Sequence, residues 1–220
     1  MEQFQGKTMS QYALFPPEDP DLVTGLSVGS ISWRNSVEIM RNYHYLGRPP
    51  GTTAKCYGLY RGGEVMGAII YGNIFRKNAA RICGVKWADS VLELSRLWVT
   101  DELPRNTESW FIARSLRLLR ADRPDIAILL SYADSNVGHV GTIYQATNWL
   151  YTGASTEGQT VDSDGNPISR RKLKRGATGY TRAHRCPKHR YVMFLGARHT
   201  RRELRHSLRW PVLPYPKNHR

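Results

Sequence analysis

The feature that most constrains this chain is the order of apolar and polar segments between Leu92 and Gly153. The pattern predicts a strand at 91–99, a helix ending near residue 121, a strand at 126–134, a short helix around 142–147 and a strand at 149–153. The first strand alternates, whereas the second is apolar almost throughout, as strands buried on both faces are. Polar residues fall at strand exits and at a helix start, where α/β proteins place their chemistry.

The remaining segments extend this pattern into a mixed sheet. A strand at 26–32 leads into a helix whose Val37, Met40 and Tyr43 share one face, and which should stop before Gly47. Arg61-Gly62-Gly63 separates two strands as a hairpin turn, and 190–196 forms the last strand. The order predicts a single-domain α/β fold with flanking helices around a mixed central sheet, similar to the Gcn5-related N-acetyltransferases, and a basic C-terminal extension.

Length and cysteine usage bound the organisation of the chain. Its 220 residues suit one α/β domain, divided here into an N-terminal arm at 1–22, an acyltransferase-like domain at 23–196 and an overlapping basic segment at 170–220. Three scattered cysteines favour a reducing cytoplasm over a disulfide framework. The sequence shows neither a signal peptide nor an apolar run of about 20 residues, so we expect a cytoplasmic protein that does not enter a membrane.

The net charge of +14 is concentrated at the C-terminal end. From Arg170 onward there are 16 of the 32 Lys and Arg residues but only one of the 18 acids, Glu203. Such a confined cationic field predicts binding to a polyanion, and we expect double-stranded DNA. A solvated tail or an acidic membrane surface are the alternatives. The residues predicted to contact DNA are Arg170, Arg171, Lys172, Lys174, Arg175, Arg201, Arg202 and Arg205.

The start of the helix after residue 104 is a candidate anion site. Free backbone N–H groups and the helix dipole favour negative charge at such a position. Arg96 and Arg105 with the Ser109 hydroxyl could hold a phosphate or an oxyanion, and Asn106 lies between them. The simpler interpretation is that Ser109 caps the helix and Arg96 is a surface charge.

Other polar residues at the ends of elements could carry catalysis. Asp134 ends an apolar strand before a glycine-containing loop and could accept a proton from an amine, although an Asx-turn is its simpler role. Tyr144 could protonate a leaving group, or merely pack. His44 titrates near neutrality and could instead cap a helix, while His139 lies in a glycine-flanked loop.

A metal site is only weakly suggested. His184, Cys186 and His189 form an H-x-C-x-x-H group that lacks a fourth ligand.

Three segments resemble the Mom family of phage DNA-modification proteins: SRLWVTDELPRNTES at 95–109, SYAD at 131–134 and GHVGTIYQA at 138–146. The resemblance implies an acyltransferase-type enzyme that converts adenine in phage DNA to N6-carbamoylmethyladenine and so protects it from host restriction. It also implies a suspected use of a metal ion, such as iron, in some members. The site residues it implies are Arg96 and Ser109 at the donor, Asp134 and Tyr144 in catalysis, and the pair His44 and Tyr45 near the substrate.

One departure from the wider acyltransferase pattern concerns the donor. The loop before the donor helix reads LPRNTES at 103–109, without the glycines that let amide groups wrap a pyrophosphate. We therefore do not expect a CoA donor that is held in the usual way. An acetyl-CoA-like thioester bound differently, or another activated acyl or glycyl carrier, stays open. Two other functions stay open: an acyltransferase acting on a small amine, a protein or tRNA, and a non-catalytic nucleic-acid-binding module.

Overall fold

The computed structural model describes residues 24–155, 159–165, 168, 178–183 and 187–217. The elements of its first half are β1 (Leu26–Ser30), α2 (Trp33–Asn42), β2 (Lys55–Arg61), β3 (Glu64–Asn73), α3 (Arg76–Cys83), η1 (Val85–Ser90) and β4 (Val91–Val99). Those of the second half are α4 (Thr107–Asp122), β5 (Ile128–Asp134), η2 (Ser135–Val137), α5 (Thr142–Ala146), β6 (Leu150–Ser155), β7 (Gln159–Val161), β8 (Thr181–Ala183), β9 (Lys188–Phe194) and α6 (Arg198–Ser207).

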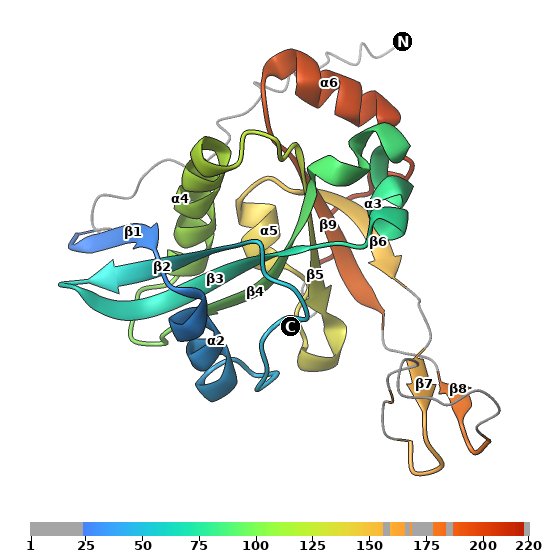
Figure 1. Cartoon of the computed structure of the whole chain (residues 1–220), viewed down its shortest axis with the longest axis horizontal. Helices are drawn as coiled ribbons and strands as arrows, with labels where there is room; N and C mark the ends of the chain where they lie inside the picture. Colours follow the sequence, from blue (N-terminus) through green and yellow to red (C-terminus); the bar gives the residue numbers. More distant parts are fainter. Residues whose placement is uncertain (1–23, 156–158, 166–167, 169–177, 184–186, 218–220) are drawn as a thin grey trace, which may run out of the picture.

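Seven strands form one mixed sheet in the order β1-β2-β3-β4-β5-β9-β6 (Figure 1). β4 and β5 pair in parallel, and the other neighbours pair antiparallel. β7 and β8 form a separate two-stranded ribbon that projects from the main sheet (Figure 1). The predicted fold class, a mixed α/β sheet with flanking helices, is therefore confirmed.

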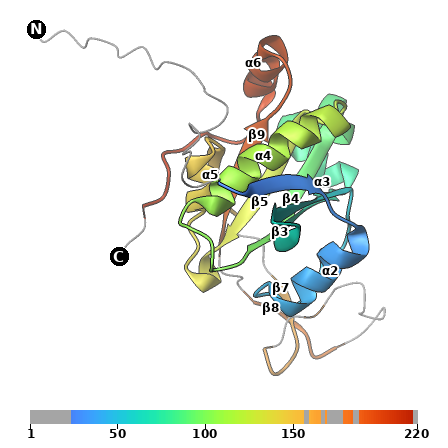
Figure 2. The same cartoon turned by 90° about the vertical axis from the view of Figure 1, so that its left-hand side faces the viewer.

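Helices cover both faces of the sheet. On one face, Phe111 and Leu116 of α4 pack in a core cluster with Tyr57 and Leu92 of the strands. On the other, α3 and Leu204 of α6 share a second cluster with β5 and β9, and Met40 of α2 joins a third. Figure 2 shows α5 on one side of β4 and β5, with α2 and α3 on the other.

Local sequence explains the first elements well. The Ser32 side chain accepts a hydrogen bond from the Asn35 N–H and caps α2, whose Val37 and Met40 are buried as predicted. Tyr43, predicted on the same face, lies at the C-cap, where it is 61% exposed and stacks on Trp98 beside the Met40 cluster. The hairpin prediction is confirmed, since its two turn glycines, 62 and 63, both have positive φ.

β4 and β5, the parallel pair at the centre of the sheet, pair only along their amino-terminal parts. Pairing runs from Val91–Ile128 to Glu93–Leu130, although β4 continues to Val99 and β5 to Asp134. In the same region, pairing with β3 passes over Ser95 as a bulge. The two strands therefore diverge toward their carboxyl ends, and the polar residues of those ends face the space between them.

Several sequence predictions concern residues outside the described ones. These are the arm at 1–22, the metal candidates His184 and Cys186, and the basic residues Arg170, Arg171, Lys172, Lys174 and Arg175. Within the described ranges, Cys56 and Cys83 are free and buried. Among the helices of those ranges, none has the length and apolar character needed to cross a bilayer.

Candidate functional site

A cleft of about 1250 Å³ opens where β4 and β5 diverge. Its lining comes from the end of α2, from β4, β5 and α3, from the loop before α5, and from the start of β9. Tyr144 on the α4 face and Asn78 on the α3 face both line it, so the cleft reaches both faces of the sheet. Its size leaves room for a nucleobase together with a second small ligand.

Asp134 lies in this cleft with its carboxylate already engaged. Its Oδ2 is 2.6 Å from the Lys188 Nζ, and its Oδ1 accepts a hydrogen bond from the Asn136 N–H at 3.1 Å. The second contact is the Asx-turn that the sequence offered as an alternative. The residue is 7% exposed, so Lys188 offsets the cost of a buried charge.

Tyr144 is buried beside β5, the strand that ends at Asp134. The Ser131 hydroxyl lies 2.8 Å from the Tyr144 hydroxyl and 2.8 Å from the Leu94 carbonyl oxygen. A carbonyl only accepts, so Ser131 either donates to Leu94 and accepts from Tyr144, or donates to Tyr144. In the second arrangement the phenol proton of Tyr144 is free to point into the cleft. Burial raises the pKa of Tyr144 to about 12, which keeps the proton on the phenol at neutral pH.

His44 and Tyr45 form an aromatic wall of the cleft. Their rings stack at 4.5 Å, and the His139 ring meets Tyr45 edge-on at 5.9 Å. The His44 Nδ1 accepts a hydrogen bond from the Leu46 N–H, which leaves the proton of the neutral ring on Nε2. Burial, assisted by the positive charge of Arg96, lowers the pKa of His44 to about 4. The prediction that His44 titrates near neutrality is therefore wrong, and the ring is neutral at pH 7.

Arg96 and Glu93 bring opposite charges to the β4 side. The Arg96 guanidinium donates to the carbonyl oxygens of Ser95 at 2.6 Å and Arg48 at 3.3 Å, and burial lowers its pKa. Burial raises the pKa of Glu93, although Arg96 and Lys188 oppose that shift. Glu93 was missed by the sequence analysis as a site residue. The missed signal is an acid three residues before Arg96 on the predicted strand at 91–99.

The predicted donor residues at the start of α4 lie differently. Arg105, Asn106 and Ser109 do not line the cleft, whereas Glu108 does. The Ser109 hydroxyl, 5% exposed, donates to the Asn106 carbonyl oxygen at 2.8 Å. Asn106 has a φ of 72° and makes no side-chain cap. The structure thus brings His44, Tyr45, Arg96, Asp134 and Tyr144 into one cleft and leaves the other three predicted residues outside its lining.

The described residues do not fit an iron ion. They contain no group of three His, Cys, Asp or Glu side chains that could hold a metal. His189, the described member of the H-x-C-x-x-H group, places its Nδ1 3.0 Å from the Tyr151 hydroxyl. No chemical step is therefore assigned to a metal.

Comparison with known proteins shows which family this chain belongs to. The sequence matches the Mom protein family over residues 25–217. The chain belongs to the Mom protein family. The methylcarbamoylase Mom of Escherichia phage Mu is 31% identical over 205 residues, which cover 87% of this chain and 84% of that protein.

Solved structures that resemble this Mom family chain are N-acetyltransferases of low sequence identity. One from Staphylococcus aureus is 11% identical with a TM-score of 0.47, over 78% of this chain and 99% of that one. One from Elizabethkingia anophelis, solved with acetyl-CoA, is 10% identical with a TM-score of 0.42, over 78% and 99%. A likeness at this level concerns the fold alone.

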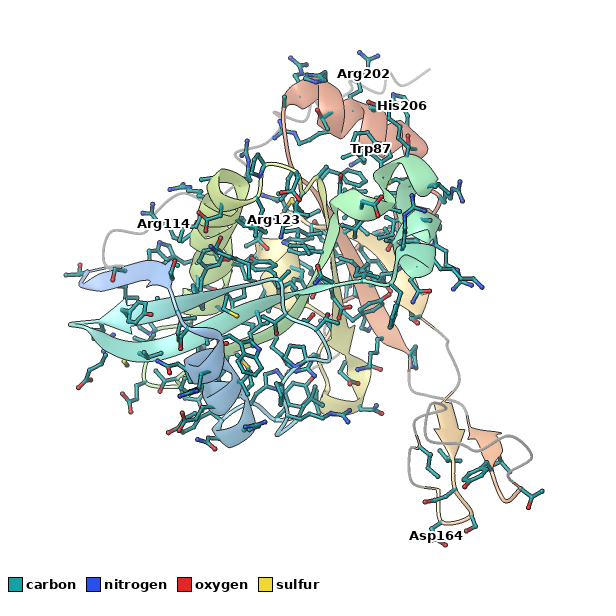
Figure 3. All side chains as sticks on the ribbon, in the orientation of Figure 1. Trp87, Arg114, Arg123, Asp164, Arg202 and His206 are labelled. Carbon is teal, nitrogen blue, oxygen red and sulfur yellow. The ribbon has the colours of Figure 1, made fainter. Side chains whose placement is uncertain are left out.

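Of the residues predicted to contact DNA, the described ones are Arg201, Arg202 and Arg205. They lie on α6, which projects Arg202 and His206 outward (Figure 3). β9 begins at Lys188, opposite Asp134, and ends at Phe194, so α6 follows the end of the sheet away from Asp134. The chain then returns, and Arg209 and Trp210 line the α3 side of the cleft. α6 itself thus does not line the cleft, but the segment that follows it does, on the α3 face.

Proposed function

We propose that this protein transfers a carbamoylmethyl group to the exocyclic N6 amine of adenine in double-stranded DNA, which protects phage DNA from host restriction. One observation carries the proposal: in a chain that belongs to the Mom family, five residues from separate segments line a single cleft. They are His44, Tyr45, Arg96, Asp134 and Tyr144. A relative at 31% identity is a methylcarbamoylase, which supports the nature of the group transferred.

The reaction needs a proton acceptor and a proton donor. The lone pair of adenine's amine is delocalised into the ring, so the amine must be aligned and must lose a proton as it attacks. In our proposal N6 forms a bond to the methylene carbon that bears the donor's carbamoyl group, and the bond from that carbon to the leaving group breaks. Asp134 orients the amine and accepts its proton, directly or through water, while Tyr144 gives its proton to the leaving group.

The donor is proposed to lie between Arg96 and the start of α4. The N–H groups of the first turn of a helix and a guanidinium attract an anionic carrier. Glu108 lies at the same helix start and opposes a strongly anionic donor there. Ser109 acts in this proposal as a positioning residue, because its hydroxyl holds the Asn106 carbonyl of the turn. A weakly anionic carrier that holds the carbamoylmethyl group through its methylene carbon meets these requirements, whereas an acetyl thioester attacked at its carbonyl carbon would leave an N6-acetyl group instead.

DNA is proposed to approach from the face that carries α2, α3 and α6. A stacked and paired adenine cannot reach a cleft, so the base must be flipped out of the duplex. The arginines of α6, namely Arg201, Arg202 and Arg205, would hold phosphates while the base enters. The donor would enter from the α4 face, because the cleft reaches both faces.

The test is mass spectrometry of nucleosides from the DNA of host cells that express the protein, against cells with an empty vector. We expect a modified deoxyadenosine. A glycyl amide and a carbamoylmethyl amine are isomers of equal mass, so fragmentation and comparison with a synthetic standard must identify the linkage. Unaltered deoxyadenosine in cells that contain folded, DNA-bound protein would contradict the proposal.

A further inference from the structure

Two aromatic rings outside the predicted site form a stack in the cleft. The rings of Tyr43 and Trp98 lie 4.8 Å apart at an angle of 24°. Both residues line the cleft, Tyr43 from the end of α2 and Trp98 from β4. Trp98 packs against the core cluster that contains Met40 and Ile70, so its ring has a firm backing.

The outer ring of this stack is open to solvent. Tyr43 is 61% exposed, whereas Asp134 and Tyr144 are 7% and 6% exposed. Tyr43 therefore lies at the mouth of the cleft and the two predicted catalytic residues lie deep within it. A large ring held flat against a second ring, with its outer face uncovered, presents a platform to a planar ligand.

The charges around the platform suit a nucleic acid. Exposed Arg41 and Arg48 bracket the run Tyr43-His44-Tyr45 in the chain. The Arg96 guanidinium, two residues before Trp98 on β4, binds the Arg48 carbonyl oxygen and so holds that segment near the stack. Aromatic rings interspersed with cations are the arrangement that binds unstacked bases and their phosphates.

We propose that the Tyr43–Trp98 stack is a binding platform for an unstacked nucleobase of the target strand at the mouth of the cleft. A base that stacks there offsets part of the cost of opening the duplex, and it guides the adenine toward Asp134 and Tyr144. The inference rests on the proposed function, because it takes DNA as the substrate. It adds a substrate-binding site to the catalytic residues.

The experiment measures binding, which is independent of modification. The probes are a fully paired oligonucleotide duplex and the same duplex with one unpaired, bulged adenine. The wild-type protein should bind the bulged duplex more tightly than the paired one. Tyr43→Ala should lose about tenfold of that preference, in line with the strength of base–aromatic stacking. Tyr43→Phe keeps the ring and should keep the preference.

Controls separate the platform from folding and from the reaction. Trp33→Ala removes another exposed aromatic of α2, 62% exposed and outside the cleft lining, and should leave the preference unchanged. Trp98→Phe should retain most of the preference, and melting temperatures report whether each variant folds. Equal preference in wild type and Tyr43→Ala would overturn the platform. A preference that depends on Tyr43, combined with unaltered deoxyadenosine, would support the platform and contradict the proposed function.

Discussion

At the scale of single residues, the two carboxylates of the cleft have different surroundings. Asp134 accepts a backbone N–H and pairs with Lys188 at 2.6 Å, so its charge is compensated. Glu93 has a pKa raised by burial, so its ionised form is the costly one. The sequence placed Asp134 at a strand exit, and the structure agrees. It could not indicate Lys188, because which distant groups share a cleft depends on the tertiary fold.

Glu93→Gln should stabilise the protein at neutral pH. A carboxyl whose folded pKa is raised favours folding below its unfolded pKa of 4.5 and loses that advantage as the pH rises through the folded pKa. Glutamine removes the penalty, so the variant's gain over wild type should grow between about pH 4 and pH 7. Urea unfolding at both values checks this expectation. An equal difference at the two pH values would show that Glu93 has an ordinary pKa.

His44→Asn should lose less stability in acid than the wild-type protein does. The folded pKa of His44 is about 4 against an ordinary value of 6.5, so the unfolded state takes up the proton first as the pH falls. Wild type should therefore lose more stability than the variant between pH 6.5 and pH 4. The Asn oxygen can still accept the Leu46 N–H. Parallel stability curves for the two proteins would contradict a buried, neutral His44.

At the scale of elements, hydrophobic patterning predicted what local sequence determines. The strand at 91–99 and the apolar strand ending at Asp134 were both found as β4 and β5. α3 and α6 were missed, because their sequences are strongly basic and each buries few residues, such as Ile82 and Leu204. Their helical state depends on packing against each other and against β9, which one segment alone does not reveal.

Charge reversal on α6 should weaken DNA binding without changing the product. Each phosphate that the protein no longer neutralises reduces the steepness of log affinity against log salt by about 0.9. Glutamates at Arg201, Arg202 and Arg205 should therefore flatten that slope, measured by fluorescence anisotropy at several salt concentrations. Reversal of Arg117 and Arg120 on α4, the opposite face, is the control and should change it less. An unchanged slope in the α6 variant would remove this helix from the DNA interface.

At the scale of the whole molecule, the divergence of β4 and β5 is what allows the proposed donor and the proposed target base to reach the cleft from opposite faces. That divergence creates a cleft that reaches both faces, so a donor on the α4 face and a base on the α2 and α3 face can meet within it. The basic helix and the aromatic stack then lie on the face from which DNA is proposed to enter. The sequence predicted the two strands, but their parallel pairing and its early end are visible only in the register.

The central claim is that Asp134 accepts the proton of the adenine amine in this cleft. The measurement is the rate of deoxyadenosine modification by Asp134→Asn and by Lys188→Gln, at equal amounts of folded, DNA-bound protein. Asparagine keeps the turn to Asn136 but loses the basicity, whereas Lys188→Gln breaks the ion pair and keeps the carboxylate. We predict a loss of about 100-fold or more for Asp134→Asn and a much smaller loss for Lys188→Gln. Equal losses in both variants, or an Asp134→Asn rate within a few-fold of wild type, would contradict the claim.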